Sequence, residues 1–201
     1  MLVISVKSAA GGVIGINHHL LIMTLHTGGR LKTSDVIWQI VKQYTDYVFF
    51  VPGGQAMHLV DSLGKSGLCH ISALHEQGAG FSACGYAQQR NGLGVVLVTS
   101  GPGATNAITP CAAAWMDSIP VLFISGQAKS DTLIGDTGLR VRGVQEVDII
   151  SLVQPITKEA YQPPTGGLAW YHCKEMIEKC LAGRMGPAWM DVPLDIQAEE
   201  I

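Results

Sequence analysis

The sequence is poor in charge and lacks the patterns that several protein classes require. Only 14% of its 201 residues are charged, below the roughly one quarter of an average soluble domain, and the formal net charge is −3. A nucleic-acid-binding protein needs a basic face, which this balance does not favour. No apolar run reaches the ~18 residues of a membrane span, since Asn17, His18 and His19 interrupt the stretch 13–25. We therefore expect neither a nucleic-acid partner nor a membrane partner.

The five cysteines include no Cys-x-x-Cys pair, and their odd number does not fit a disulfide framework. No His/Cys spacing indicates zinc, so we assign no metal ligand within the chain. We interpret the cysteines as buried thiols of a reducing compartment, which predicts a cytoplasmic protein. They are Cys69, Cys84, Cys111, Cys173 and Cys180.

Residues 1–30 hold only Lys7 and Arg30 as fixed charges and show no compact apolar core followed by a cleavage site. A targeting segment is one explanation for them. We favour the other, an irregular N-terminal extension that precedes a single domain over residues 31–197. The length of the chain is sufficient for one domain with a real core.

Apolar strands alternate with helical segments along that domain. The patterns predict strands over residues 47–51, 70–74, 95–99, 121–125 and 188–192. They predict helices over residues 33–44, 55–65, 76–90, from the turn at 100–103 to 114, 146–152 and 171–181, with a looser glycine-rich stretch at 126–143. Because each strand is apolar on both faces, we predict an α/β fold with a parallel sheet flanked by helices on both faces.

Ligands of open α/β sheets bind beyond the carboxyl ends of the strands. Four segments fall there, and three of them are rich in glycine, which lets the backbone approach a ligand closely. They are residues 52–55, 75–77, 99–106 and 126–127. The sequence contains no phosphate-binding G-x-x-x-x-G-K-[ST], no dinucleotide-binding G-x-G-x-x-G and no G-x-S-x-G, so a nucleotide-binding protein is disfavoured.

Glu76 follows the predicted strand 70–74 directly and opens a helix. One explanation is favourable interaction with the helix dipole, because acidic residues suit the first turn. The other is a carboxylate placed at a ligand site. A capping role is the simpler explanation for His75, and a tight strand-to-helix connection explains the Gly101-Pro102-Gly103 turn equally well.

In their order and spacing, these motifs resemble the N-terminal domain of acetolactate synthase and related thiamine-diphosphate enzymes. The resemblance extends over residues 31–197, and residues 1–30 take no part in it. It implies a thiamine-diphosphate-binding fold, of which this chain would be the pyrimidine-binding domain. The matching runs are 51–54 (VPGG), 74–80 (LHEQGAG), 85–87 (GYA), 99–106 (TSGPGATN), 116–121 (MDSIPV), 124–127 (ISGQ), 145–149 (QEVDI), 155–158 (PITK), 186–188 (GPA) and 191–193 (DVP).

The resemblance also implies roles for single residues. In that family the glutamate matching Glu76 hydrogen-bonds N1′ of the aminopyrimidine and so promotes removal of the proton from C2 of the thiazolium. The enzyme would decarboxylate a 2-oxo acid such as pyruvate and ligate the product to a second carbonyl, as in branched-chain amino acid biosynthesis. Turn geometry and capping are simpler explanations for several other matching residues. By resemblance, Gly53, Gly54 and Gln55 would edge the cofactor, Thr99, Pro102 and Asn106 would line the pyrimidine pocket, and Gln145 would face the substrate.

The family's diphosphate and Mg²⁺ are held by a separate domain with a G-D-G…N motif, which residues 134–137 (IGDT) do not provide. The resemblance therefore implies a chain that is inactive alone and needs a diphosphate-binding domain from another chain or from further sequence. A homo-oligomer or hetero-oligomer would follow. A subunit of a split 2-oxo-acid decarboxylase and a truncated, non-catalytic interaction module remain alternatives.

The sequence departs from acetolactate synthases just before Gln145, where they typically have phenylalanine and this chain has Val144. The preceding segment is longer and doubly basic. Arg140 or Arg142 would suit an anionic substrate group, although a solvated basic loop explains both arginines equally well. We assign Arg140 to the substrate side and leave the 2-oxo acid unspecified.

Overall fold

The computed structural model describes residues 30–201, so the predicted extension over residues 1–30 lies almost wholly outside the described part. Within that part the strands form one parallel sheet of six strands in the order β2-β1-β3-β4-β6-β5. The predicted α/β fold with a parallel sheet is confirmed. The strands are β1 (Tyr47–Phe50), β2 (Cys69–Ser72), β3 (Gly94–Val98), β4 (Val121–Gln127), β5 (Ala160–Tyr161) and β6 (Ala188–Pro193).

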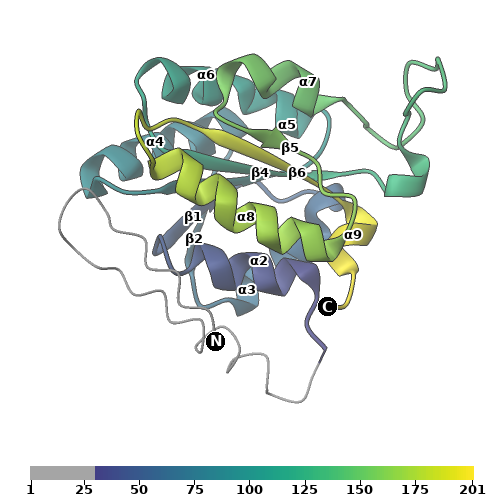
Figure 1. Cartoon of the computed structure of the whole chain (residues 1–201), viewed down its shortest axis with the longest axis horizontal. Helices are drawn as coiled ribbons and strands as arrows, with labels where there is room; N and C mark the ends of the chain where they lie inside the picture. Colours follow the sequence, from purple (N-terminus) through teal and green to yellow (C-terminus); the bar gives the residue numbers. More distant parts are fainter. Residues whose placement is uncertain (1–29) are drawn as a thin grey trace. The chain divides into compact units, whose positions relative to one another are not determined.

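Helices cover both faces of the sheet (Figure 1). One face carries α2 (Thr33–Val41), α3 (Met57–Lys65), α8 (Gly166–Leu181) and α9 (Leu194–Ala198). The other carries α4 (Glu76–Arg90), α5 (Pro102–Asn106), α6 (Ile108–Met116) and α7 (Ile149–Val153), and the short 3-10 turns are η1 (Gly54–Ala56), η2 (Ser130–Thr132) and η3 (Gln154–Ile156). Across residues 30–201, no helix is both long enough and apolar enough to cross a membrane.

The core lies around the central strands, where every residue of β3, β4 and β6 is buried. Phe123 and Trp189 stack in parallel there, with ring centroids 5.1 Å apart. The small residues of α4 let this helix approach the sheet closely. A Cβ on Gly94 would lie 2.4 Å from the carbonyl oxygen of Ala83, and one on Gly80 would lie 2.3 Å from Pro110. Small residues therefore let α4 pack closely against both β3 and α6.

Several predicted boundaries differ from the structure. The helix expected to reach residue 114 is broken at Ala107 into α5 and α6, and α7 begins at Ile149 instead of residue 146. Helix α8 begins five residues before the predicted start, because Thr165 caps it by accepting a hydrogen bond from the amide of Leu168 at 3.3 Å. The low helix propensity of Gly166 and Gly167 concealed this start. Strand β5 and helix α9 were missed because they are too short to show a period.

The expectation that each strand is apolar on both faces is wrong for β2, which includes His70 and Ser72. This strand pairs only with β1, and all four of its residues are exposed. The prediction of five buried thiols is wrong for the same reason, because Cys69 begins β2 and is exposed while the other four are buried. Burial raises the pKa of Cys84 to about 11 and that of Cys180 to about 12, which makes these thiols unreactive.

Candidate functional site

Glu76 is the first residue of α4 and follows the end of β2 by four positions. His75 is the N-cap of this helix, and its Nδ1 accepts a hydrogen bond from the amide of Gln77 at 3.2 Å. His75 therefore has a capping role, at the start of α4 and not at the end of a strand. The cap fixes the start of α4 and thereby the point from which the Glu76 side chain leaves the backbone.

The Glu76 carboxylate is half-buried and held on one side only. Its Oε2 accepts a hydrogen bond from Nδ2 of Asn106, the last residue of α5, at 2.9 Å. Its Oε1 lies beside Gly103, where a Cβ would be 3.4 Å away. No residue between 30 and 201 donates a hydrogen bond to this second oxygen. The carboxylate is thus oriented by the protein and has one oxygen available to a ligand.

Thr99 lies between two glycines at the carboxyl end of β3. A Cβ on Gly53 would come within 2.5 Å of the Thr99 side chain, and a Cβ on Gly103 within 2.7 Å. Packing inside this chain therefore requires glycine at both positions. At Gly54 a Cβ would meet nothing within 4 Å, so the chain's own packing does not require that glycine. Pro102 is exposed at the first position of α5, where its fixed φ suits a helix start.

The structure brings Gln145 to the same turn. A Cβ on Gly101 would lie 2.3 Å from the carbonyl oxygen of Gln145, so only glycine fits there.

Arg140 is placed differently. It is exposed on the excursion between η2 and α7, which projects from the body of the domain (Figure 1). Arg140 forms no ion pair with any residue that the structure describes, and no described contact joins it to Glu76.

Gln55 lies over the carboxyl end of β4. Its carbonyl accepts a hydrogen bond from Nε2 of Gln197 at 2.7 Å, and a Cβ on Gly126 would be 2.1 Å from that carbonyl. The side-chain Oε1 of Gln55 and the Oγ of Ser100 are buried, with no hydrogen-bond partner among the described residues. Such atoms are uncommon in folded proteins and often mark a place that water or a ligand completes. Both lie in segments that the sequence placed at the carboxyl ends of the strands.

Sequence reasoning missed a buried polar network beside this region. Asp191, only 1% exposed, accepts hydrogen bonds from Ser125 Oγ at 2.6 Å, Gln127 Nε2 at 2.9 Å and Gln162 Nε2 at 2.8 Å. Burial raises the pKa of Asp191 to about 6, against the lowering effect of these donors. The signal was present in the sequence, because an aspartate within the otherwise apolar strand Ala188–Pro193 is costly unless it is paired.

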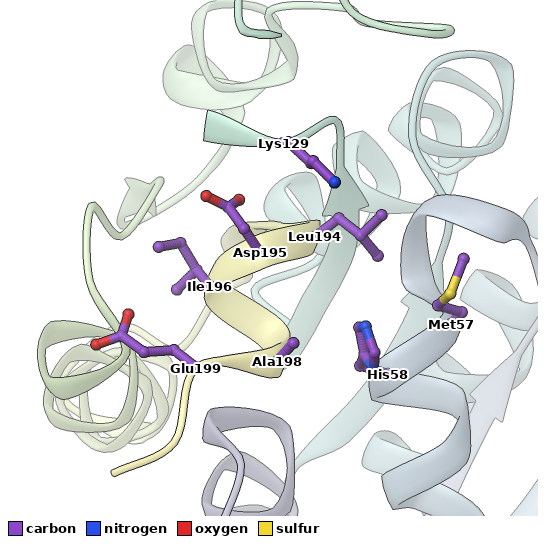
Figure 2. A pocket seen from close by; sticks show the side chains of 8 residues that line it. All are labelled: Met57, His58, Lys129, Leu194, Asp195, Ile196, Ala198 and Glu199. Atoms are coloured by element: carbon purple, nitrogen blue, oxygen red, sulfur yellow. The ribbon is translucent and has the colours of Figure 1, made fainter. Parts of the chain in front are cut away.

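A pocket of about 650 Å³ lies elsewhere and contains none of the predicted site residues (Figure 2). Two of its charged side chains already have partners. Asp195 accepts hydrogen bonds from the amide and hydroxyl of Ser130, and Glu199 accepts one from the amide of Gly166 at 2.7 Å. Its lining therefore serves the packing of α9. The lining residues are Met57, His58, Lys129, Leu194, Asp195, Ile196, Ala198 and Glu199.

Comparison with known proteins gives consistent matches. The family model described as "Thiamine pyrophosphate enzyme, N-terminal TPP binding domain" matches residues 31–152, which include every predicted site residue. The acetolactate synthase large subunit of Corynebacterium glutamicum is 39% identical over 157 residues, covering 78% of this chain and 24% of that protein. The large subunit of Lactococcus lactis is 37% identical over 170 residues, covering 84% of this chain and 28% of that protein.

The acetolactate synthase isozyme 3 large subunit of Escherichia coli is 38% identical over 175 residues, covering 87% of this chain and 29% of that protein. The chain thus spans about a quarter of the length of the curated relatives it matches. The matched part contains Glu76, Asn106, Thr99 and the glycines around them.

Proposed function

Because the chain belongs to the thiamine pyrophosphate enzymes, through their N-terminal TPP-binding domain, we propose that it holds the pyrimidine ring of thiamine diphosphate in an acetolactate synthase-like enzyme. The observation that carries the proposal is the Glu76 carboxylate. Asn106 holds its Oε2, and no described residue donates to its Oε1. A ring nitrogen that shares a proton with a carboxylate would complete this arrangement.

The proposed ring would lie beside glycine backbone. Gly103 is next to Oε1 of Glu76, and Gly53 and Gly103 both pack against Thr99 with no room for a Cβ. The unpartnered Oε1 of Gln55 and Oγ of Ser100 offer polar atoms at the same edge of the sheet. When bound, thiamine diphosphate supplies the electron acceptor for loss of carbon dioxide from a 2-oxo acid. In this proposal Glu76 holds a proton at the ring nitrogen, and Asn106 keeps the carboxylate pointed at it.

The remaining parts of the site are proposed to come from elsewhere. In the family that the sequence resembles, a separate domain with a G-D-G…N motif holds the diphosphate and Mg²⁺. We propose the same division here, with that domain on another chain or in further sequence. The assembly would be an oligomer in the cytoplasm, and this chain would be inactive alone. Its reaction would be decarboxylation of a 2-oxo acid such as pyruvate and ligation of the product to a second carbonyl.

Binding can be tested without the missing domain. The free pyrimidine half, 4-amino-5-hydroxymethyl-2-methylpyrimidine, is titrated into the full chain and followed by ligand-observed NMR. Binding should weaken at least about tenfold in Glu76→Gln, because the amide cannot share a proton with the ring. Glu178→Gln, at an exposed position of α8, is the matched control and should bind like the wild type. Equal binding by Glu76→Gln would contradict the proposed role.

Activity separates the alternatives. Thiamine diphosphate, Mg²⁺ and pyruvate are supplied with the chain, with and without the diphosphate-binding domain of an acetolactate synthase large subunit. Carbon dioxide release that needs both proteins, and falls at least about 100-fold in Glu76→Gln, supports the proposal. Carbon dioxide without a ligated product would favour a split decarboxylase. Release by this chain alone would overturn the division of the site.

A further inference from the structure

Gln145 is held in an uncommon backbone conformation directly before two anchored residues, Glu146 and Val147. Its φ is +55°, a value that costs energy for a residue other than glycine and persists only where the surroundings impose it. The first anchor is the Glu146 carboxylate, which accepts hydrogen bonds from three backbone amides and so closes the base of the projecting excursion. These amides belong to Ile134, Arg142 and Gly143.

The second anchor is Gln127, at the end of β4. Its Nε2 donates to the carbonyl of Val147 at 2.9 Å, two residues after Gln145. The same nitrogen donates to Oδ2 of Asp191 at 2.9 Å, and its Oε1 accepts from the amide of Ala128 at 2.9 Å. Gln127 is only 2% exposed. Both Nε2 and Oε1 of the Gln127 amide are therefore hydrogen-bonded, so Val147 bonds to a fixed side chain of β4.

We propose that Gln127, oriented by the buried Asp191 carboxylate, is a positioning residue that holds Gln145 against Gly101. Gln127 bonds Val147, Val147 fixes the segment that follows Gln145, and the Gln145 carbonyl lies against Gly101, where a Cβ would be 2.3 Å from it. The view that Gln145 faces a substrate rests on the proposed function. The anchoring itself rests on the described contacts alone.

A matched pair of variants isolates this anchor. Gln127 and Gln162 both donate to Oδ2 of Asp191, at 2.9 and 2.8 Å, but only Gln127 also bonds Val147. Methionine has nearly the length of glutamine and no amide, so Gln127→Met and Gln162→Met remove the donors with little change in volume. Hydrogen exchange is measured by NMR on the full 201-residue chain, without cofactor.

In Gln127→Met the amides of Arg142, Gly143 and Glu146 should exchange about tenfold faster, because the segment loses one hydrogen bond to the sheet. In Gln162→Met they should exchange at the wild-type rate, and amides of α8 should be unchanged in both. Wild-type rates in Gln127→Met, or equal acceleration in Gln162→Met, would overturn the proposal. If Gln127→Met does not fold, Gln127→Asn, too short to reach both partners, is compared in the same way.

In an active assembly, the KM for substrate and the Kd of the cofactor distinguish a positioning role of Gln127 from a merely structural one. Gln127→Met should raise KM for the 2-oxo acid about tenfold and leave the Kd of thiamine diphosphate unchanged. The reverse pattern would overturn the assignment to the substrate side. Because hydrogen exchange needs no cofactor, a failure of thiamine diphosphate binding would refute the proposed function without affecting the anchoring result.

Discussion

The strands β3, β4 and β6 differ from the edge strand β2 in how much of their surface this chain covers by itself. We call the part of the sheet formed by β3, β4 and β6 the buried side and the edge at β2 the exposed side. Every residue of β3, β4 and β6 is buried, whereas all of β2 is exposed. The exposed side also carries large apolar side chains. Leu74 is 106% exposed, and Ile71 and Phe81 are each 47% exposed. Exposed apolar surface often marks a site of interaction in proteins, and the assembly proposed above would cover this one.

The polar groups show the same contrast. Asp191, on the buried side, has three side-chain donors from its own chain. Glu76, next to the exposed side, has one donor, and its second oxygen has none among residues 30–201. The buried side thus supplies its own hydrogen-bond donors, whereas the described residues leave one oxygen of Glu76 without a donor. Each prediction below tests one part of that contrast.

The largest effect on stability is expected in the buried side. Trp189 is fully buried, stacks on Phe123, and donates from Nε1 to Ser125 Oγ at 2.9 Å. Trp189→Ala should lower the free energy of unfolding by about 3–5 kcal/mol, because it leaves a cavity and removes the hydrogen bond that Ser125 Oγ accepts. Trp115→Ala, at a 40% exposed position of α6, should cost clearly less. Urea titration measures both variants. Equal losses in the free energy of unfolding would contradict the contrast between buried and exposed positions.

Asp191 makes the stability of the buried side depend on pH. Its folded-state pKa is about 6, above the ordinary 3.8, because burial disfavours the charged form. The folded protein therefore binds this proton more tightly than the unfolded chain. The resulting stability is fully present below pH 3.8 and is lost as pH rises through about 6, a change of roughly 3 kcal/mol.

Asp191→Asn should abolish that part of the pH dependence. The asparagine oxygen can still accept from Gln127 and Gln162, so the variant should remain folded. Thermal unfolding of both proteins between pH 3.5 and 7 gives the difference, in which groups common to both cancel. A difference that does not change with pH would show that the pKa of Asp191 is the same in the folded and unfolded states.

The central strands could be predicted from sequence because burial on both faces leaves a continuous apolar run. Residues 95–98 and 121–125 show such runs, and both segments lie in strands. β5 could not be found, because its two residues pair only with β6 and show no pattern. The exposure of β2 could not be predicted either. Its residues 69–72 (CHIS) show no pattern that distinguishes an exposed edge strand from a buried one.

The candidate site was predictable to a different degree. The motifs place Glu76, Thr99 and Asn106 at strand ends, and the structure brings these three together. The contact of Gln145 with Gly101 joins segments far apart in sequence, so no local pattern could show it. The same is true of the bond from Gln127 to Val147.

A smaller difference in the free energy of unfolding is expected between substitutions of two neighbouring glycines. In Gly53→Ala the new Cβ would collide with Thr99 at 2.5 Å, so we expect a loss of about 1–3 kcal/mol in the free energy of unfolding. In Gly54→Ala the new Cβ meets nothing within 4 Å, so stability should change by less than about 0.5 kcal/mol. Urea unfolding of both variants measures this. A large loss in Gly54→Ala would mean that the chain itself requires that glycine.

The smallest effect on stability is expected at the exposed side. Leu74→Ser should change the free energy of unfolding by less than about 0.5 kcal/mol, because the side chain has almost no contacts to lose. It should, however, reduce self-association of the chain in sedimentation velocity, since Leu74 is the most exposed apolar side chain beside Glu76. Met116→Ser, at a 68% exposed residue of α6, is the control and should associate like the wild type. A wild-type chain that is monomeric at high concentration would show that the exposed side needs no cover, and the contrast would then reflect a tolerated surface instead of an unfinished site.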